Sequence, residues 1–429
     1  METFGRSGTA AAVAAMLSTP VAAQTQPASL QSRADELLAL LNGQGTPDAL
    51  FAPAFLAAVP AAKVNEITVG LASLYGKAER VTLTPTDANR AKLLFTYERG
   101  TVDMAMQIDA TAPNQVIGLL ITGSGFTGGL PQVIRTLHAL PGKTGFAFAK
   151  LGDGAPQMLD AQDADQPMAL GSAFKLVILA ELVREIAAGE RQWTDMVTLD
   201  GGQLPGGTYT QMPAGTKVSL LELAQKMISI SDNSATDILL ATLGRAKVEA
   251  MMGEVGWQNT ARNRPFLSTL EMFKIKGIAR FRQAWPTLDE KGRRALLKEI
   301  DTAPLSAIDQ NLFKDGKPIL IEQAEWFASP ADMIRTMDWL RKHTETGAGA
   351  QARGILSINP GVPRGPGNAQ YSYIGYKGGS EPGVITMSFL LQGKDGWYAM
   401  SAGWNNPSDK VEEGMLITLI SSAIGATGK

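Results

Sequence analysis

The sequence predicts an α+β protein with two folded units. In the first unit, segments with the hydrophobic spacing of helices come before segments in which polar and apolar residues alternate. In the second and larger unit, alternating or β-branched segments stand near both ends, and helical spacing fills the middle. Helices and strands that are grouped along the chain in this way are typical of the α+β class with antiparallel sheets.

The composition is that of an ordinary globular protein. The chain has 429 residues, 45% hydrophobic and 19% charged, which is enough for two or three domains with a sizeable core. Its 39 lysines and arginines nearly balance 41 aspartates and glutamates, so no basic field favours nucleic acid as a partner. It has two histidines and no cysteine, which excludes a cysteine nucleophile and leaves a His/Cys metal site without ligands. We therefore expect no metal and no cofactor.

The N-terminus has the pattern of an export signal. Residues 10–23 form a short apolar run that ends in Val21-Ala22-Ala23, an A-x-A-like cleavage site before Gln24. The run is too short to span a bilayer, no later run predicts a membrane helix, and no cysteine follows it for a lipid anchor. The sequence predicts a signal peptide over residues 1–23 and a periplasmic or secreted mature protein. The alternative is an Ala-rich leader without structure.

Residues 24–122 are expected to form a small α+β domain. Turn signals such as Asp87-Ala88-Asn89 separate its alternating segments, which favours a four-stranded antiparallel meander. The Gly-rich segment 123–130 is predicted to be a linker, because it lacks the Lys-Ser or Lys-Thr that would close a phosphate-binding loop. The predicted helices cover 30–41, 49–59 and 63–75, and the predicted strands cover 79–86, 90–97, 101–108 and 115–122.

Residues 131–429 are expected to form the second domain, with one antiparallel sheet built from both ends of this segment. Helices between the two groups of strands should flank the sheet. The start of the segment predicts a helix over 132–140 and strands over 144–150 and 157–160. Its end predicts strands over 373–376, 384–391 and 397–404 and a helix over 410–424.

The first motif of chemical interest is Ser172-Ala173-Phe174-Lys175, at the start of a predicted helix over 174–186 that is apolar nearly all round. A spacing of three residues places Lys175 one turn from Ser172 on the same face. Burial lowers the pKa of an ammonium group, so Lys175 is suited to act as a general base on a Ser172 nucleophile. Taken alone, the motif favours the alternative of a helix-capping serine and a solvated lysine.

The second motif is Ser231-Asp232-Asn233, on a predicted turn between a helix over 218–230 and a helix that starts at 233 or 234 and ends at 243. The first of these helices opens with the capping-box pattern Ser219-Leu-Leu-Glu222. On such a turn the Ser231 hydroxyl is suited to relay a proton to a leaving group, and Asn233 to bind a substrate carbonyl. The alternative is that these residues are ordinary turn formers.

The third motif is Lys377-Gly378-Gly379-Ser380, on a predicted strand. Glycines weaken a strand unless something approaches the backbone closely, and a substrate lying along Gly379 and Ser380 is such a reason. Lys377 is suited to attract a carboxylate and to lower the pKa of the Ser231 hydroxyl. The backbone N–H groups of Ser172 and Ser380 would form an oxyanion hole. The alternative is a β-bulge with a solvated lysine.

Together and in this order, the three motifs resemble the class A β-lactamases and the penicillin-recognising serine enzyme superfamily. The resemblance covers residues 131–429 and extends to the stretches 227–237 and 326–333. It is greatest to two-domain class A-like serine hydrolases typified by the β-lactamase-like protein of the clavulanic-acid biosynthetic cluster, in which a small steroid-isomerase-like α+β domain comes first. It implies Ser172, Lys175, Ser231 and Lys377 as catalytic residues.

The sequence also departs from this pattern. Class A β-lactamases carry an E-x-x-x-N whose glutamate activates the deacylating water, and this chain has none; Glu322 and Glu325 precede Ser329-Pro330 without the asparagine. Residues 276–317 predict a helical insertion, and Gly378 replaces the hydroxyl residue that follows the motif lysine. The resemblance therefore implies acylation of Ser172 more firmly than efficient β-lactam hydrolysis.

The function expected from the sequence is a serine hydrolase that forms a Ser172 acyl-enzyme with a small ester, β-lactam or amide substrate. An esterase or a weak β-lactamase is favoured, because an ester needs less assistance to its leaving group than an amide. The alternatives are a D-alanyl-D-alanine peptidase and a non-catalytic penicillin-binding module that stays acylated. The sequence indicates no particular oligomeric state.

Overall fold

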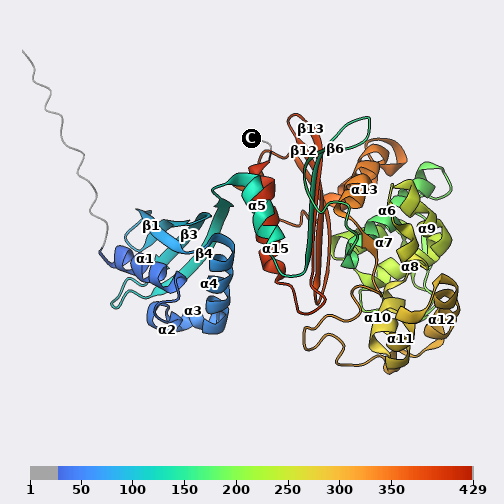
Figure 1. The fold of residues 1–429 in the computed structure, drawn as a ribbon, viewed down its shortest axis with the longest axis horizontal. Coiled ribbons are helices and arrows are strands. Elements are labelled where there is room, and N and C mark those ends of the chain that lie inside the picture. The colour runs from blue at the N-terminus through green and yellow to red at the C-terminus, as the bar shows by residue number, and fades with distance from the viewer. Residues whose placement is uncertain (1–27, 428–429) are drawn as a thin grey trace, which may run out of the picture.

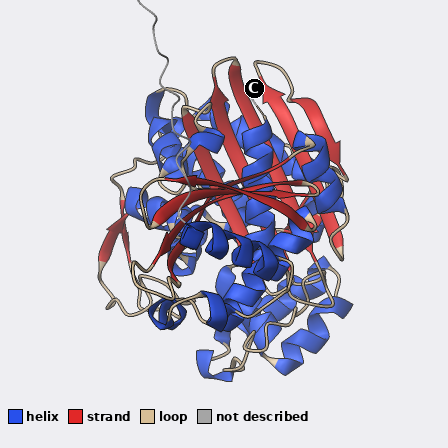
Figure 2. Ribbon diagram, turned by 90° about the vertical axis from the view of Figure 1, so that its left-hand side faces the viewer, coloured by secondary structure: helices blue, strands red, loops and turns tan. Residues whose placement is uncertain are grey.

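The computed structural model describes residues 28–427, so the predicted signal peptide over residues 1–23 lies outside it. Figure 1 shows a small unit that begins the chain and a larger unit that contains the rest. Figure 2 looks from the side of the small unit, with its sheet in front of the larger one. Each unit combines antiparallel strands with helices, which confirms the predicted α+β class.

The small unit packs helices against an antiparallel meander with the strand order β1-β2-β3-β4. Alternate residues of β2 point into its core, as the sequence alternation predicts, and include Leu93 and Phe95. Its helices are α1 (Ala28–Leu41), α2 (Pro47–Leu50), α3 (Pro53–Ala58) and α4 (Ala61–Tyr75). Its strands are β1 (Ala78–Pro85), β2 (Arg90–Tyr97), β3 (Gly100–Ile108) and β4 (Val116–Phe126).

The larger unit is built on a five-stranded antiparallel sheet with the order β11-β12-β13-β5-β6, so both ends of the segment meet in one sheet as predicted. Helices α5 and α15 cover the face toward the small unit, and the other helices cover the opposite face (Figure 1). The sheet strands are β5 (Lys143–Leu151), β6 (Gln157–Gln162), β11 (Tyr373–Glu381), β12 (Val384–Gly393) and β13 (Gly396–Asn405).

The rest of the larger unit is mostly helical. None of the helices between residues 28 and 427 has the length and hydrophobicity needed to cross a membrane. The helices are α5 (Gly129–His138), α6 (Lys175–Ala187), α7 (Leu220–Ser229), α8 (Asn233–Leu243), α9 (Arg245–Glu254), α10 (Thr269–Gly277), α11 (Ala279–Ala284), α12 (Glu290–Thr302), α13 (Pro330–His343), α14 (Ala350–Ser357) and α15 (Glu413–Ala426). Short strand pairs are formed by β7 (Met168–Ala169) with β10 (Phe327–Ala328) and by β8 (Met196–Thr198) with β9 (Lys217–Ser219). The 3-10 helices are η1 (Gly171–Phe174), η2 (Thr260–Asn263), η3 (Trp285–Thr287), η4 (Leu305–Ala307), η5 (Gly347–Gly349) and η6 (Pro366–Asn368).

Three local predictions need correction. The helix predicted over 49–59 is two short helices, because Pro53 begins α3 and disfavours a helical conformation at the residue before it. Strand β4 runs on to Phe126 and pairs it with Gly100, so part of the 123–130 segment is strand rather than linker. The capping box of α7 is half formed, because the Glu222 carboxylate accepts a hydrogen bond from the Tyr209 hydroxyl at 2.9 Å.

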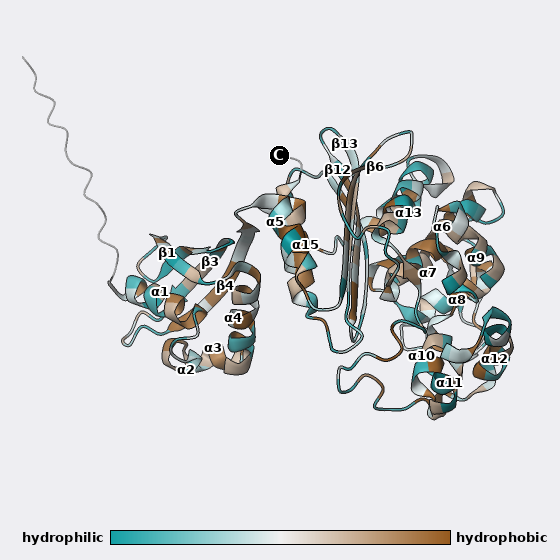
Figure 3. Ribbon diagram, viewed as in Figure 1, coloured by the Kyte–Doolittle hydropathy of each residue, from teal (hydrophilic) through white to brown (hydrophobic). Residues whose placement is uncertain are grey.

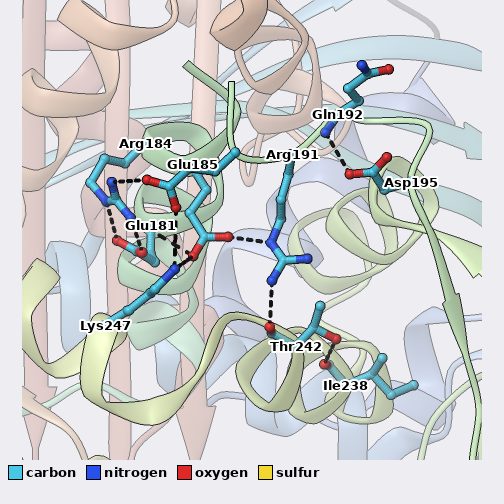
Figure 4. Close-up of polar contacts among 10 residues, drawn as sticks. Glu181, Arg184, Glu185, Arg191, Gln192, Asp195, Ile238, Thr242 and Lys247 are labelled. Atoms are coloured by element: carbon cyan, nitrogen blue, oxygen red, sulfur yellow. Dashed lines mark hydrogen bonds and ion pairs between the residues drawn. The ribbon is translucent and has the colours of Figure 1, made fainter. Parts of the chain in front are cut away.

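Helix α6 is the central element of the helical layer, and it follows directly on Ser172. Nearly all of its side chains are buried, in accordance with its apolar sequence (Figure 3). Its C-terminal part carries two buried glutamates, and Figure 4 shows how cations surround them. Arg184 pairs with Glu181 at 2.8 Å, and Lys247 of α9 pairs with Glu185 at 2.5 Å. The first pair lies within α6, and the second ties the far end of α6 to α9, which helps to hold the helix that follows the first motif.

Candidate active site

Ser172 lies on the 3-10 turn η1, at the entrance to α6. The turn leads into an α-helix that begins at Lys175, one residue later than predicted. Gly171 has φ +50°, and a Cβ there would meet the backbone nitrogen of Ser380 at 2.8 Å. A side chain at this position would be strained by both the backbone angle and the contact. Glycine therefore allows η1 to lie directly against strand β11.

Gly379 of the third motif makes room for the same contact from the other side. A Cβ at Gly379 would clash with backbone atoms of Leu170 and Ser172. The close contact at Gly379 is made by the chain's own turn η1, and the binding of a substrate along Gly379 and Ser380 stays a prediction. The contact brings the backbone of Ser172 beside that of Ser380, as a shared oxyanion hole requires.

Lys175 is fully buried, so the alternative of a solvated surface lysine is wrong. Its Nζ donates hydrogen bonds to the backbone oxygen of Ser231 at 2.6 Å and to Oδ1 of Asn233 at 2.8 Å, and it lies 3.2 Å from Oγ of Ser231. Among the described residues, no hydrogen bond joins it to Ser172. The amine of the first motif is therefore hydrogen-bonded to residues of the second motif.

The electrostatics of the site favour neutral amines. Burial lowers the pKa of Lys175 to about 7, although the charges of Asp237 and Asp232 act in the opposite direction. Burial also lowers the pKa of Lys377 well below its ordinary value, and the nearby charge of Lys175 lowers it further. A general base with a pKa near neutrality is well matched to proton transfer at physiological pH.

The second motif forms the tight turn between α7 and α8 that the sequence predicts. Ser231 has φ +59°, a left-handed conformation that is uncommon outside glycine and that often marks functional sites. Asp232 then caps α8, accepting hydrogen bonds from the backbone N–H groups of Ala235 at 2.8 Å and Thr208 at 2.6 Å. The aspartate fixes the turn, so the strained serine stays directed at the two lysines.

Lys377 reaches the same serine from the sheet. Its Nζ donates to Oγ of Ser231 at 3.0 Å and to the backbone oxygen of Gly378 at 2.6 Å. The side chain is buried, and β11 pairs with β12 in unbroken register, so the alternative of a bulge with a solvated lysine is wrong. The Ser231 hydroxyl therefore lies between the amines of Lys175 and Lys377.

All seven residues singled out from the sequence gather around two adjoining cavities. Lys175 lies behind them, with its amine on the second motif. A cavity of about 290 Å³ is lined by Ser172, Ser231, Lys377, Gly379 and Ser380. A second cavity of about 240 Å³ is lined by Asn233 and shares Ser172 and Ser380 with the first.

One family model matches the larger unit of the chain. Residues 131–427 match the model of the β-lactamase enzyme family. The chain belongs to this family. No curated protein matches it.

Solved structures similar to this β-lactamase family member are distant from it in sequence. A β-lactamase from Sphaerobacter thermophilus is 20% identical, with a TM-score of 0.48, and the match covers 70% of this chain and 95% of that one. A β-lactamase from Chitinophaga pinensis is 16% identical, with a TM-score of 0.46 and coverage of 69% and 96%. The protein called PBP-A is 18% identical, with a TM-score of 0.45 and coverage of 70% and 94%.

Sequence reasoning missed Tyr376, which lines the first cavity of this β-lactamase family member. A Cβ at Gly378 would clash with the Tyr376 hydroxyl, and a Cβ at Gly361 would clash with its ring. The ring also packs on Phe389, with 4.9 Å between centroids.

Burial raises the pKa of Tyr376 to about 12, so the phenol remains a hydrogen-bond donor. The Tyr376 hydroxyl thus occupies the space of the side-chain hydroxyl that the family pattern places at position 378, where this chain has glycine. Residues 376 and 378 share one face of a strand, and that spacing was the available signal.

The two glutamates before Ser329 lie in different surroundings. Glu322 is exposed and pairs with Lys143 at 2.6 Å. Glu325 is buried and lines the second cavity together with Ser172. Only Glu325 therefore belongs to the site.

Proposed function

We propose that this β-lactamase family member is a serine hydrolase that forms an acyl-enzyme on Ser172 Oγ. The observation that carries the proposal is the position of the Ser231 hydroxyl, 3.2 Å from Lys175 and 3.0 Å from Lys377, on the cavity that also contains Ser172. This arrangement supports proton transfer without histidine, because buried amines with lowered pKa values can accept and return a proton.

In the proposed acylation, neutral Lys175 accepts the proton of Ser172 as Oγ attacks the substrate carbonyl. The backbone N–H groups of Ser172 and Ser380 stabilise the negative charge that develops on the carbonyl oxygen. The proton then passes through Ser231 and Lys377 to the leaving group. Asn233 uses Oδ1 to accept from Lys175, which leaves its amide N–H₂ to bind a substrate carbonyl.

The proposed substrate is a small ester, with a β-lactam or other amide as a slower substrate. An alkoxide leaves with less proton assistance than an amine, so an ester makes smaller demands on the relay. Strand β11 lies at the edge of the sheet, so a substrate that extends along it can pair with its backbone. The only cation that lines the first cavity within the described residues is Lys377, whose lowered pKa weakens its attraction for a substrate carboxylate.

Intact-protein mass spectrometry tests the proposal. Wild-type protein and Ser172→Ala are mixed separately with p-nitrophenyl acetate and with nitrocefin, while turnover is followed optically. We expect a Ser172-dependent adduct and faster turnover of the ester. An adduct that persists for hours with nitrocefin would instead support a penicillin-binding module. No adduct and no Ser172-dependent turnover would overturn the serine hydrolase.

We also propose that the mature protein is periplasmic or secreted and starts near Gln24. The support is the apolar run that ends in Val21-Ala22-Ala23. Sequencing the N-terminus of the protein after expression with an intact leader tests this. A retained leader would overturn it.

A further inference from the structure

A buried ion cluster lies beside Ser172 and takes no part in the acylation proposed above. Nζ of Lys276, at the end of α10, binds Oε1 of Glu325 at 2.9 Å and Oε1 of Glu381 at 2.5 Å. The side chains of Lys276 and Glu325 are fully buried, and that of Glu381 is 8% exposed. One lysine cannot neutralise two carboxylates, so the cluster either keeps a negative charge or holds a proton.

The two glutamates form a carboxyl pair with unequal environments. Burial raises the pKa of Glu381 well above its ordinary value, and the negative charge of Glu325 raises it further. Both carboxyl groups bind the same Nζ of Lys276, so a proton on the cluster is shared by the pair rather than assigned to one residue. Such a pair can accept a proton at one oxygen and donate one at another.

The cluster faces the acylation site through the second cavity. This cavity, of about 240 Å³, is lined by Glu325 and Glu381 together with Ser172, Asn233 and Ser380. It is large enough for several water molecules. The carboxyl pair and the nucleophile therefore border one space.

One buried oxygen of the carboxyl pair lacks a partner. Oε2 of Glu381 forms no hydrogen bond within the described residues, and Glu381 lines the cavity. Buried polar atoms in proteins are nearly always hydrogen-bonded, so this oxygen is a candidate partner for a water molecule from the cavity. Glu381 follows Ser380 directly in strand β11, so such a water would lie near the proposed oxyanion hole.

We propose that the Glu325–Glu381 pair binds and activates the water that hydrolyses the Ser172 acyl-enzyme, with Lys276 as the residue that positions the pair. The inference rests on the proposed serine hydrolase. The ionised carboxylate takes one proton from water, and the water oxygen attacks the acyl carbonyl carbon. As the bond from that carbon to Ser172 Oγ breaks, the proton returns from the pair to Oγ. The released acid carries the water oxygen, and the enzyme is restored.

The test compares acylation with deacylation in Glu381→Gln and Glu325→Gln. Each change keeps the side-chain shape and removes the ability to accept a proton. With p-nitrophenyl acetate, we expect the burst of p-nitrophenol to keep its amplitude and its rate within about twofold, and the steady state to fall about 100-fold or more. Mass spectrometry should show the acyl-enzyme accumulating. Added hydroxylamine, which attacks an ester without a general base, should restore turnover.

A matched control separates chemistry from stability. Glu185 is also buried and ion-paired with a lysine, but it lies on the far part of α6 (Figure 4). Glu185→Gln should lower the melting temperature and leave the ratio of burst to steady-state rate unchanged. The burst amplitude reports the fraction of folded, competent sites in every variant.

The outcomes distinguish the two proposals. If the wild-type protein never acquires an adduct, the serine hydrolase fails and this inference fails with it. If the wild-type protein turns over and both glutamine variants deacylate as fast, the inference alone is overturned. A loss of burst and steady state by the same factor, without rescue by hydroxylamine, would also overturn it, because it would assign the glutamates a structural role.

Discussion

The hydroxyl of Ser231 accepts a hydrogen bond from Nζ of Lys377 across 3.0 Å, although the two residues are 146 positions apart in the chain. One comes from a turn of the helical layer and the other from the edge strand of the sheet. The bond therefore joins the two layers at the cavity that contains Ser172. In the proposed mechanism, this hydrogen bond lies on the path of the proton that the leaving group receives.

Ser231→Ala should slow the acylation of amides more than that of esters. The change removes the hydroxyl between the two lysine amines, so an amine leaving group loses its proton donor while an alkoxide can leave without one. We expect about a 100-fold or larger fall in acylation by nitrocefin and less than tenfold in acylation by p-nitrophenyl acetate. Stopped-flow absorbance measures both. Equal losses with the two reagents would contradict a role in leaving-group protonation.

The rate of Ser172 acylation should rise with pH and level off above about 8. Burial lowers the pKa of Lys175 to about 7, and only its neutral form can accept the Ser172 proton. Below pH 7 the protonated fraction grows, so each further unit should lower the rate about tenfold. The burst rate with p-nitrophenyl acetate, measured from pH 5 to 9, checks this midpoint. A rate that is flat or falls over this range would exclude Lys175 as the base.

Lys175→Met should abolish acylation while raising stability. Burial disfavours the charged form of Lys175 in the folded chain. Between pH 7 and 10.5 the unfolded chain therefore binds more protons at this residue than the folded chain does, so the free energy of unfolding of the wild type rises with pH. Methionine fills the space without that penalty, and we expect a gain of about 1–4 kcal/mol at pH 6. Urea unfolding of both proteins measures the difference. A marked loss of stability would show that the amine's hydrogen bonds to Ser231 and Asn233 outweigh its burial.

The sequence predicted most of the helices and strands well, because each depends on local spacing. The alternation in β2 and the apolar run of α6 follow from nearest neighbours along the chain. The motif residues were singled out because the three motifs occur in a recognisable order along the chain. The sequence alone could not predict contacts between segments that are far apart in the chain. The sequence indicated that something approaches Gly379, but only the structure shows that this is the turn η1.

The same reason explains which parts of the site were missed. Lys276 and Glu381 are 105 positions apart, and no local pattern marks either as buried. A lysine and two glutamates in a sequence ordinarily predict a solvated surface, since charged side chains are rarely buried unless paired. The pairing that permits burial arises only when α10, β11 and the segment before β10 meet.

Gly378→Thr should be destabilising in the natural chain and tolerated once Tyr376 is shortened. A Cβ at position 378 would clash with the Tyr376 hydroxyl, which is held by Phe389 and by the room at Gly361. Overpacking of this kind costs about 1–3 kcal/mol. We expect a coupling of about 1 kcal/mol or more between Gly378→Thr and Tyr376→Ala in a double-mutant cycle of unfolding free energies. Additive effects would show that the phenol does not occupy the place of the missing hydroxyl. Tyr376→Phe is the matched control: it removes the donor and keeps the ring, so it should change ester turnover more than stability.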